Sequence, residues 1–328
     1  MDSSSRQGLV LRIDAKVCHV EVDGQRHVLP LRGRLFERHR ASRRPLAVGD
    51  LVVVRFGADG GAIEELLPRI SELHRRASTE GEARMQVLAA NITLVVAVAS
   101  AEDPPFQPLL VDGVLAAAAR EGIDSALAIT KVDLSADGAE TWARVYAGAG
   151  CRVFRTSTEP GRRTDQSLSE LAALLHENRS VLCGPSGAGK STLLNALVPG
   201  LGLEVGGLNH IGQGRHTTTR TELFPLPGGG HVLDTPGIRS FHLFHVGSQE
   251  LSFYFPEIDA VRGSCRFSGC LHRAEPGCAV RAAAQSGRIP KSRFASYAVM
   301  LEAALEAEEP SAPTRRSGGA GKRRPTPP

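Results

Sequence analysis

The chain contains the segment Gly184-Pro185-Ser186-Gly187-Ala188-Gly189-Lys190-Ser191, which matches the pattern GxxxxGK[ST] and follows the short apolar run Ser180–Cys183. Glycines let such a loop curl so that its backbone N–H groups point at a chain of phosphates, and a helix beginning near Lys190 adds the positive end of its dipole. We expect Lys190 to reach the β- and γ-phosphates of a nucleotide and Ser191 to ligate Mg²⁺, and we expect the next residue, Thr192, to contact the nucleotide. The strand before the loop and the helix after it favour a phosphate site over a chance glycine turn.

A second candidate segment, Asp234-Thr235-Pro236-Gly237, follows the apolar run His231–Leu233. A carboxylate at a strand end, here Asp234, can hold Mg²⁺ through water, and the N–H of Gly237 can sense a γ-phosphate. Alone this tetrapeptide is a common turn, but beside a phosphate loop it indicates a nucleotide-sensing element.

The third segment is Thr130-Lys131-Val132-Asp133, at the end of the apolar run Ala126–Ile129. A carboxylate there can accept hydrogen bonds from guanine N1–H and the 2-amino group together, and adenine does not offer these donors. Asp133 therefore predicts GTP over ATP, although a solvated turn would be favoured if the segment stood alone.

The order of these segments is unusual, because Asp133 precedes Lys190 and Lys190 precedes Asp234. In ordinary GTP-binding folds the phosphate loop comes first and the base-specifying motif last. Circular permutation preserves such a site, since strands pair by position in the sheet and the usual ends lie close together. The segment after Gly237 then enters the C-terminal region directly, and we expect this junction to transmit the nucleotide state.

The regions around these segments predict a parallel sheet wrapped by helices. Continuous apolar runs at Ile92–Ala99 and Ala126–Ile129 are typical of strands covered on both faces. Helical spacing at Leu109–Arg120 and Leu168–His176 alternates with them, which is typical of an α/β fold. A further helix is expected over Lys291–Glu308.

The N-terminal region has short alternating runs separated by turn residues, which predict a five-stranded β-barrel of the oligonucleotide-binding (OB) type. The runs are Gly8–Ile13, Val17–Val22, Arg26–Leu31 and Gly49–Val54. We therefore predict a multidomain α/β protein with an OB-type barrel over 1–75, a circularly permuted P-loop GTPase fold over 76–243, a zinc-binding helical module over 244–308 and a disordered basic tail over 309–328.

Cysteine and histidine gather near the C-terminus, in the spacing C-x4-C-x-H-x5-C. In a reducing compartment, three cysteines and one histidine suit a closed, tetrahedral, structural Zn²⁺ better than a disulfide. Such an ion would stabilise a module too small to fold alone. The expected ligands are Cys265, Cys270, His272 and Cys278.

Composition bounds the class of protein. The 328 residues are 41% hydrophobic and 23% charged, without an apolar run long enough to span a membrane, which excludes a wholly disordered, collagen-like or membrane-spanning chain. The N-terminus lacks a secretory pattern, so we expect a cytoplasmic protein. The net charge of +4 stems from the tail, whose cations either stay solvated or contact RNA. Seven arginines against one acid over Arg26–Arg44 predict a better polyanion surface.

Together, the barrel, the permuted motifs and the cysteine cluster resemble the RsgA (YjeQ) family of circularly permuted GTPases that depend on the small ribosomal subunit. Further matching stretches are Leu31–Arg34, Val48–Asp50, Ala90-Asn91 and Gly214–Thr219. The resemblance implies hydrolysis of GTP to GDP and phosphate, coupled to late maturation of the small (30S) subunit, with 16S rRNA contacts from the barrel and the zinc module. It also favours a monomer, as does the absence of a heptad repeat, and no membrane partner is expected.

Two features set the chain apart from patterns known in GTPases. The base motif begins with Thr130 where the family usually has Asn, so we expect weaker nucleotide affinity with guanine selectivity retained on Asp133. The segment Thr156-Ser157-Thr158 resembles the backbone segment that faces the guanine 6-oxo group.

The water-orienting group is the second feature. Ile238 occupies the place of the glutamine of Ras-like proteins and cannot orient an attacking water. His216 is the nearest candidate for that role, unless it contacts RNA instead, and Thr218 or Thr219 is the candidate metal sensor. We expect slow turnover until a partner orders the loop Gly206–Arg220.

Two other readings stay open at this point. The protein could be an rRNA-binding assembly factor that senses GTP and for which hydrolysis is incidental. It could also be a P-loop kinase of small molecules, although Asp133 and the fused modules argue against that reading.

Overall fold

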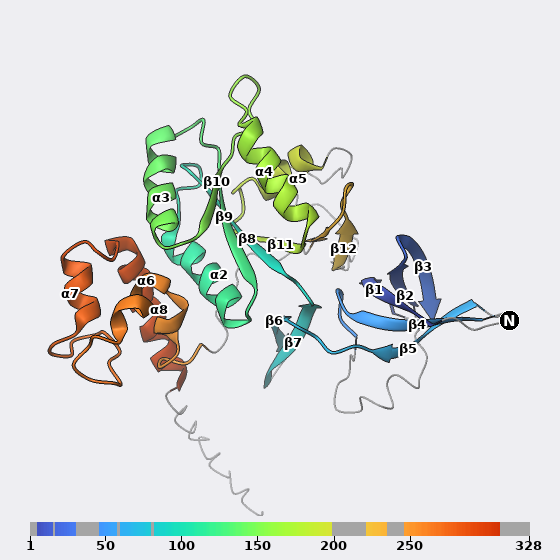
Figure 1. Ribbon diagram of the computed structural model, residues 1–328, viewed down its shortest axis with the longest axis horizontal. Coiled ribbons are helices and arrows are strands. Elements are labelled where there is room, and N and C mark those ends of the chain that lie inside the picture. The colour runs from blue at the N-terminus through green and yellow to red at the C-terminus, as the bar shows by residue number, and fades with distance from the viewer. Residues whose placement is uncertain are drawn as a thin grey trace, which may run out of the picture.

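The computed structural model describes residues 5–15, 17–30, 46–57, 60–79, 82–198, 221–234 and 246–308 (Figure 1). Several predicted elements lie outside these residues. They are the loop with His216, Thr218 and Thr219, the stretch Thr235–Ile238, most of the arginine-rich segment, and the basic tail.

The centre of the molecule is a largely parallel sheet in the order β10-β9-β8-β11-β13-β12. Its strand β8 is buried at every position, as expected for a strand covered on both faces. Only β12 runs antiparallel to its neighbour, β13. The strands are β8 (Leu94–Ser100), β9 (Asp124–Thr130), β10 (Arg152–Arg155), β11 (Arg179–Cys183), β12 (Glu222–Pro225) and β13 (His231–Asp234).

Helices cover both faces of this sheet, and alternate residues of β8 belong to two separate cores. Val95 and Ala97 belong to the core that includes α2 and α3 residues. Val96 and Val98 belong to the core that includes α4 and α5 residues. The helices are α2 (Pro108–Arg120), α3 (Ala136–Gly148), α4 (Asp165–His176) and α5 (Lys190–Leu197), of which α3 was not among the predicted elements.

The N-terminal strands form the expected OB-type barrel. Strand β1 pairs with β2 and with β4, β2 pairs with β3, and β4 pairs with β5, all antiparallel. The β2–β3 turn uses Asp23 and Gly24 at φ +51° and +75°, as a tight hairpin requires. Strand β5 lies against β3, since a Cβ at Gly61 would be 2.8 Å from Leu29 Cδ2. The strands are β1 (Ser5–Ile13), β2 (Val17–Val22), β3 (Gln25–Pro30), β4 (Leu51–Gly57) and β5 (Gly60–Leu66).

The barrel is joined to the central sheet by strand pairing and by buried polar contacts. Strand β1 pairs with β12 at Arg12 and Glu222, so one hydrogen-bonded sheet crosses the boundary. Buried Asp50 binds Arg69 at 2.7 Å, and the Asn91 amide donates to the Gly49 carbonyl at 3.0 Å. Two further strands, β6 (Glu72–Thr79) and β7 (Glu82–Ala90), form a separate hairpin that was not among the predicted elements.

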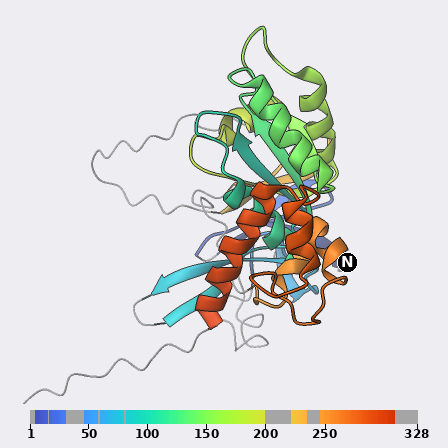
Figure 2. The same cartoon turned by 90° about the vertical axis from the view of Figure 1, so that its left-hand side faces the viewer.

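The C-terminal module is helical, and α8 lies against α2 of the central domain (Figures 1 and 2). Its core includes Phe255, Ile258, Val280 and Tyr297, and also Ala116 from α2. Across the described ranges, we find no helix long and apolar enough to cross a membrane. The elements are the 3₁₀ turn η1 (Leu251–Tyr254), α6 (Pro256–Arg262), α7 (Ala279–Gln285) and α8 (Lys291–Glu308).

Candidate nucleotide site and metal cluster

The phosphate loop lies between the end of β11 and the start of α5. A Cβ at Gly184 would be 2.0 Å from the Val98 carbonyl oxygen, so only glycine allows the loop to pass this close to β8. Gly187 and Gly189 take φ values of +80° and +82°, which a residue with a side chain adopts only with strain. The glycines therefore shape a curled loop at the N-terminus of a helix, an arrangement that can bind a phosphate anion.

The Lys190 side chain folds back into this loop. Its Nζ donates hydrogen bonds to the carbonyls of Gly184 at 2.9 Å and Pro185 at 2.7 Å. Ser191 and Thr192 follow in the first turn of α5. An ammonium group and a helix N-terminus thus meet at one place, which favours negative charge there.

The base motif lies at the carboxyl end of β9, with Lys131 in a left-handed conformation at φ +53°. The Ser157 hydroxyl donates to Asp133 Oδ1 at 2.6 Å, and Ser157 itself is buried. Arg162 donates to the Asp133 carbonyl at 3.2 Å. The structure therefore brings Asp133 together with the segment Thr156–Thr158, which the sequence placed only by resemblance.

Thr130 joins the base motif to the phosphate loop. Its hydroxyl oxygen lies 2.6 Å from the carbonyl of Ala188 and 3.3 Å from that of Ala99, so its single proton is best placed for Ala188. Gly189 is also adjacent, since a Cβ there would be 3.5 Å from Thr130 Oγ1. Threonine at this position thus supplies a direct contact between the two motifs, which the sequence pattern did not predict.

A further segment at this edge of the sheet, Ala101–Gln107, was also missed. Lys131 Nζ donates a hydrogen bond to the Asp103 carbonyl, and the Ala101 N–H donates to the Thr130 carbonyl at 2.9 Å. Pro104 faces the phosphate loop, because a Cβ at Gly187 would be 3.5 Å from its Cδ. The available signal was its position after β8, since parallel sheets carry sites at the carboxyl ends of their strands.

Asp234 ends β13, which runs parallel to β11 in the register Val181 to Leu233. Its backbone therefore lies at the same edge of the sheet as the phosphate loop. Gly237, the other residue expected from this motif, lies outside the part of the chain that the structure describes.

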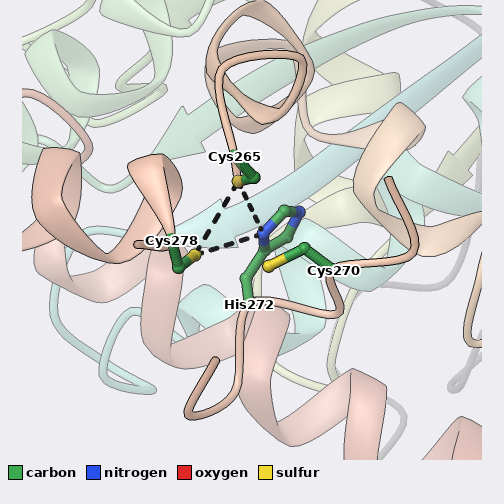
Figure 3. Close-up of side chains that lie close together, drawn as sticks. All are labelled: Cys265, Cys270, His272 and Cys278. Carbon is green, nitrogen blue, oxygen red and sulfur yellow. Dashed lines mark hydrogen bonds between the residues drawn. The ribbon is translucent and has the colours of Figure 1, made fainter. Parts of the chain in front are cut away.

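The four expected metal ligands come together in the C-terminal module (Figure 3). Their ligand atoms all lie within 4.8 Å of one another. His272 Nδ1 is 3.6 Å from Cys265 Sγ and 3.4 Å from Cys278 Sγ, and the two sulfurs are 3.9 Å apart. The spacing of the donors and their identity fit a tetrahedral ion held by three thiolates and one imidazole.

The surroundings of the cluster shift the pKa values of three of its four side chains. Burial lowers the pKa of His272, which favours the neutral ring that can bind a metal. Burial raises the pKa of Cys265, but hydrogen bonds from the Val280 and Ala279 backbone outweigh it and the net shift is downward. Burial raises the pKa of Cys270 to about 12, so this thiol would need a bound cation to lose its proton.

Comparisons with known proteins agree with the fold and the motifs described above. The family model described as RsgA GTPase matches residues 66–244. The chain is 41% identical over 270 residues to the small ribosomal subunit biogenesis GTPase RsgA of Chlorobaculum parvum, covering 81% of this chain and 82% of that protein. It is 37% identical to the protein of the same name from Moorella thermoacetica, over 92% of this chain and 98% of that protein.

Two solved structures are similar over nearly the whole chain. YjeQ from Thermotoga maritima matches with a TM-score of 0.73 and 29% identity, covering 92% of this chain and 99% of that chain. YloQ, described as a circularly permuted GTPase, matches with a TM-score of 0.72 and 28% identity, covering 94% and 98%. The motif order and the fold thus agree with a circularly permuted GTPase architecture.

Proposed function

The chain belongs to the RsgA GTPase family, and we propose that it hydrolyses GTP to GDP and phosphate in late maturation of the small (30S) ribosomal subunit. The observation that carries this proposal is the meeting of the phosphate loop with Asp133 and Ser157 at one edge of the sheet. Neither an rRNA-binding factor for which hydrolysis is incidental nor a small-molecule kinase is favoured by these relatives.

For the nucleotide, we propose that the backbone of Gly184–Ser191 and the Lys190 ammonium hold the β- and γ-phosphates. Ser191 and, through water, Asp234 would hold the Mg²⁺ that accompanies GTP. Asp133 would accept from the guanine N1–H and 2-amino group, while Ser157 fixes its carboxylate by the 2.6 Å hydrogen bond. The remaining proposed contacts come from Thr130, Lys131, Val132, Thr192 and Gly237.

For hydrolysis, we propose that His216 orients the attacking water and that Thr218 or Thr219 senses the metal. We assign these roles from the sequence, because Ile238 stands where Ras-like proteins have a glutamine that orients the water. Binding to the ribosomal subunit would then supply the order that the catalytic loop needs.

The metal cluster is proposed to hold one structural Zn²⁺ through Cys265, Cys270, His272 and Cys278. The donor set supports this assignment, because three sulfurs and one imidazole leave a tetrahedral ion without an open position for chemistry. For partners, we propose 16S rRNA contacts from the barrel and the zinc module, in a monomer that works in the cytoplasm.

The test is phosphate release from GTP and from ATP, each with and without purified small ribosomal subunits, at a stated salt concentration. We expect strong stimulation only with GTP and only with small subunits. Lys190→Ala is the control for the site and should abolish the stimulated rate. Equal turnover of ATP, or GTP turnover unaffected by the subunit, would contradict the proposal.

A further inference from the structure

A single stretch of chain, Ser100–Asp112, contacts both the nucleotide site and the C-terminal module. It leaves β8 at the carboxyl edge of the sheet and becomes α2 at Pro108. Its two ends therefore lie in different parts of the molecule, and its path between them is short.

At the nucleotide end, this stretch is held by the base motif. The Asp103 carbonyl accepts from Lys131 Nζ and from the Ser100 hydroxyl, the latter at 2.9 Å. The Ala101 N–H donates to Thr130 at 2.9 Å. A shift of this backbone would move the Lys131 side chain and the Pro104 ring beside the phosphate loop.

In the middle, aromatic packing holds the stretch against α3. Phe106 stacks on Trp142 of α3, with ring centroids 4.4 Å apart and planes at 12°, and lies 5.7 Å from the Tyr146 ring. Trp142 is the only tryptophan in the chain. Its fluorescence therefore reports on the packing of Phe106 without any labelling.

At the other end, Asp112 of α2 is fully buried and forms an ion pair with Arg293 of α8 at 2.6 Å. Arg293 is 3% exposed, and it also binds Glu257 of α6 at 2.6 Å. Its guanidinium lies 5.4 Å from the Tyr146 ring centre and 4.7 Å from that of Phe255. One buried arginine thus connects the module, α2 and the aromatic cluster.

The buried ion pair between Asp112 and Arg293 favours the docked position of α8 on α2. Burial raises the pKa of Asp112, and the Arg293 charge opposes that shift. Hydrogen bonds from Ser296 and Tyr146 also lower this pKa, but a buried carboxylate loses much of its stabilisation when its charged partner is displaced. Displacing α8 from α2 would therefore be unfavourable, and the position of α2 follows that of the module.

We propose that Arg293 is a positioning residue for the guanine nucleotide site, acting through Asp112 and the segment Ala101–Gln107. The C-terminal module then contributes to nucleotide affinity although its metal cluster belongs to a separate part of the fold. By reciprocity, nucleotide binding also stabilises the docking of the module. This inference rests on the proposed GTPase function.

The test compares matched substitutions on the two partners of Arg293. Asp112→Asn and Asp112→Leu weaken or remove the link to α2, whereas Glu257→Gln weakens the link within the module and leaves Asp112 in place. Each full-length variant is measured for GDP affinity by calorimetry, for the change in Trp142 emission on GDP binding, for KM and kcat, and for its melting temperature.

We expect GDP affinity to fall by roughly fivefold or more in the Asp112 variants and to stay within about twofold of wild type in Glu257→Gln. The Trp142 response to GDP should shrink in the Asp112 variants, and KM should rise more than kcat falls. If Asp112→Leu does not fold, Asp112→Asn carries the comparison alone.

Unchanged GDP affinity and Trp142 response in Asp112→Asn would overturn the inference, even if the melting temperature falls. Equal weakening in Glu257→Gln would also overturn it, because general destabilisation would then explain the effect. If wild-type protein binds no guanine nucleotide, the proposed function itself fails, which is a different result.

Discussion

The candidate metal cluster and the proposed nucleotide site are assembled in opposite ways. All four metal donors come from the fourteen-residue stretch Cys265–Cys278. The nucleotide site draws on segments around Asp103, Asp133, Ser157 and Lys190, which only the folded sheet brings together. A local site stabilises its own module, whereas a dispersed site depends on the packing of the whole domain.

Removing a metal ligand should have the largest effect. Cys278 caps α7, where its sulfur accepts from the Arg281 N–H, and serine also serves as a helix cap. Cys278→Ser therefore removes a soft ligand and keeps the cap. We expect loss of bound zinc and a strongly destabilised C-terminal module, because structural zinc contributes up to about 10–16 kcal/mol in small modules, while the apolar core that includes Phe255 and Tyr297 remains.

This result is measured by metal analysis and by protease sensitivity of the module. The matched control is Cys151→Ser, a half-buried cysteine outside the cluster, which should keep one zinc per chain. A Cys278→Ser protein with full zinc content and a protected module would show that Cys278 is not a required metal ligand.

A substitution in the dispersed site should instead change specificity and leave the fold intact. Asp133→Asn replaces one acceptor by a donor, while Oδ1 can still accept from Ser157. GTP affinity should fall by about 3 kcal/mol, or roughly 100-fold, and xanthosine triphosphate, which has a 2-oxo group, should bind better than GTP.

The measurement is competitive binding of the two nucleotides, with the melting temperature as control for folding. Retention of the guanine preference in this variant would remove Asp133 from the base site.

The contact between the two nucleotide motifs should have a smaller effect. Thr130→Val keeps the shape of the side chain but leaves the Ala188 carbonyl without its hydroxyl partner. We expect a loss of about 1–2 kcal/mol in nucleotide affinity, roughly tenfold, with the preference for GTP over ATP unchanged. Thr130→Ser should restore the affinity, and failure of that rescue would indicate a packing effect of the methyl group.

The smallest effect concerns pH in the metal-free protein. Burial lowers the pKa of His272, so the unfolded chain binds its proton more readily than the folded module does. Stability is therefore present above the ordinary histidine pKa of about 6.5 and is lost as pH falls below it, by at most about 1.4 kcal/mol per pH unit.

Melting of the zinc-free module between about pH 7 and about pH 5 measures this slope. Metal-free His272→Gln should lose the part of the slope that this histidine contributes, and an unchanged slope would assign the effect to other groups.

Sequence patterns were sufficient to predict features that depend on residues close together in the chain. Strand Val17–Val22 and helix Lys291–Glu308 have the predicted bounds, because alternation and helical periodicity are properties of consecutive residues. The metal cluster was found for the same reason. Its ligands are separated by few residues, so spacing alone brings them together.

The missed features depend on partners far along the chain. Helix α3 contains Gly138 and Gly148, which weaken its helical signal, and it is stabilised by packing of Trp142 and Tyr146 against Phe106. Arg293 has the appearance of an ordinary surface residue of α8 until the fold places Asp112 beside it. Likewise, the Thr130 to Ala188 contact spans 58 residues of sequence.

The pairing of β1 with β12 forms late in biosynthesis. Strand β1 leaves the ribosome early, but Arg12 and its partner Glu222 are 210 residues apart. At translation rates of about 5–20 residues per second, β1 waits roughly 10–40 s before β12 is made. During that interval the edge of β1 that later meets β12 is unpaired, and unpaired strand edges are sites of aggregation. The barrel can form through β2 and β4 in that time, and because β4 pairs with Ser5–Leu9, only the part of β1 around Arg12 stays exposed in the nascent chain.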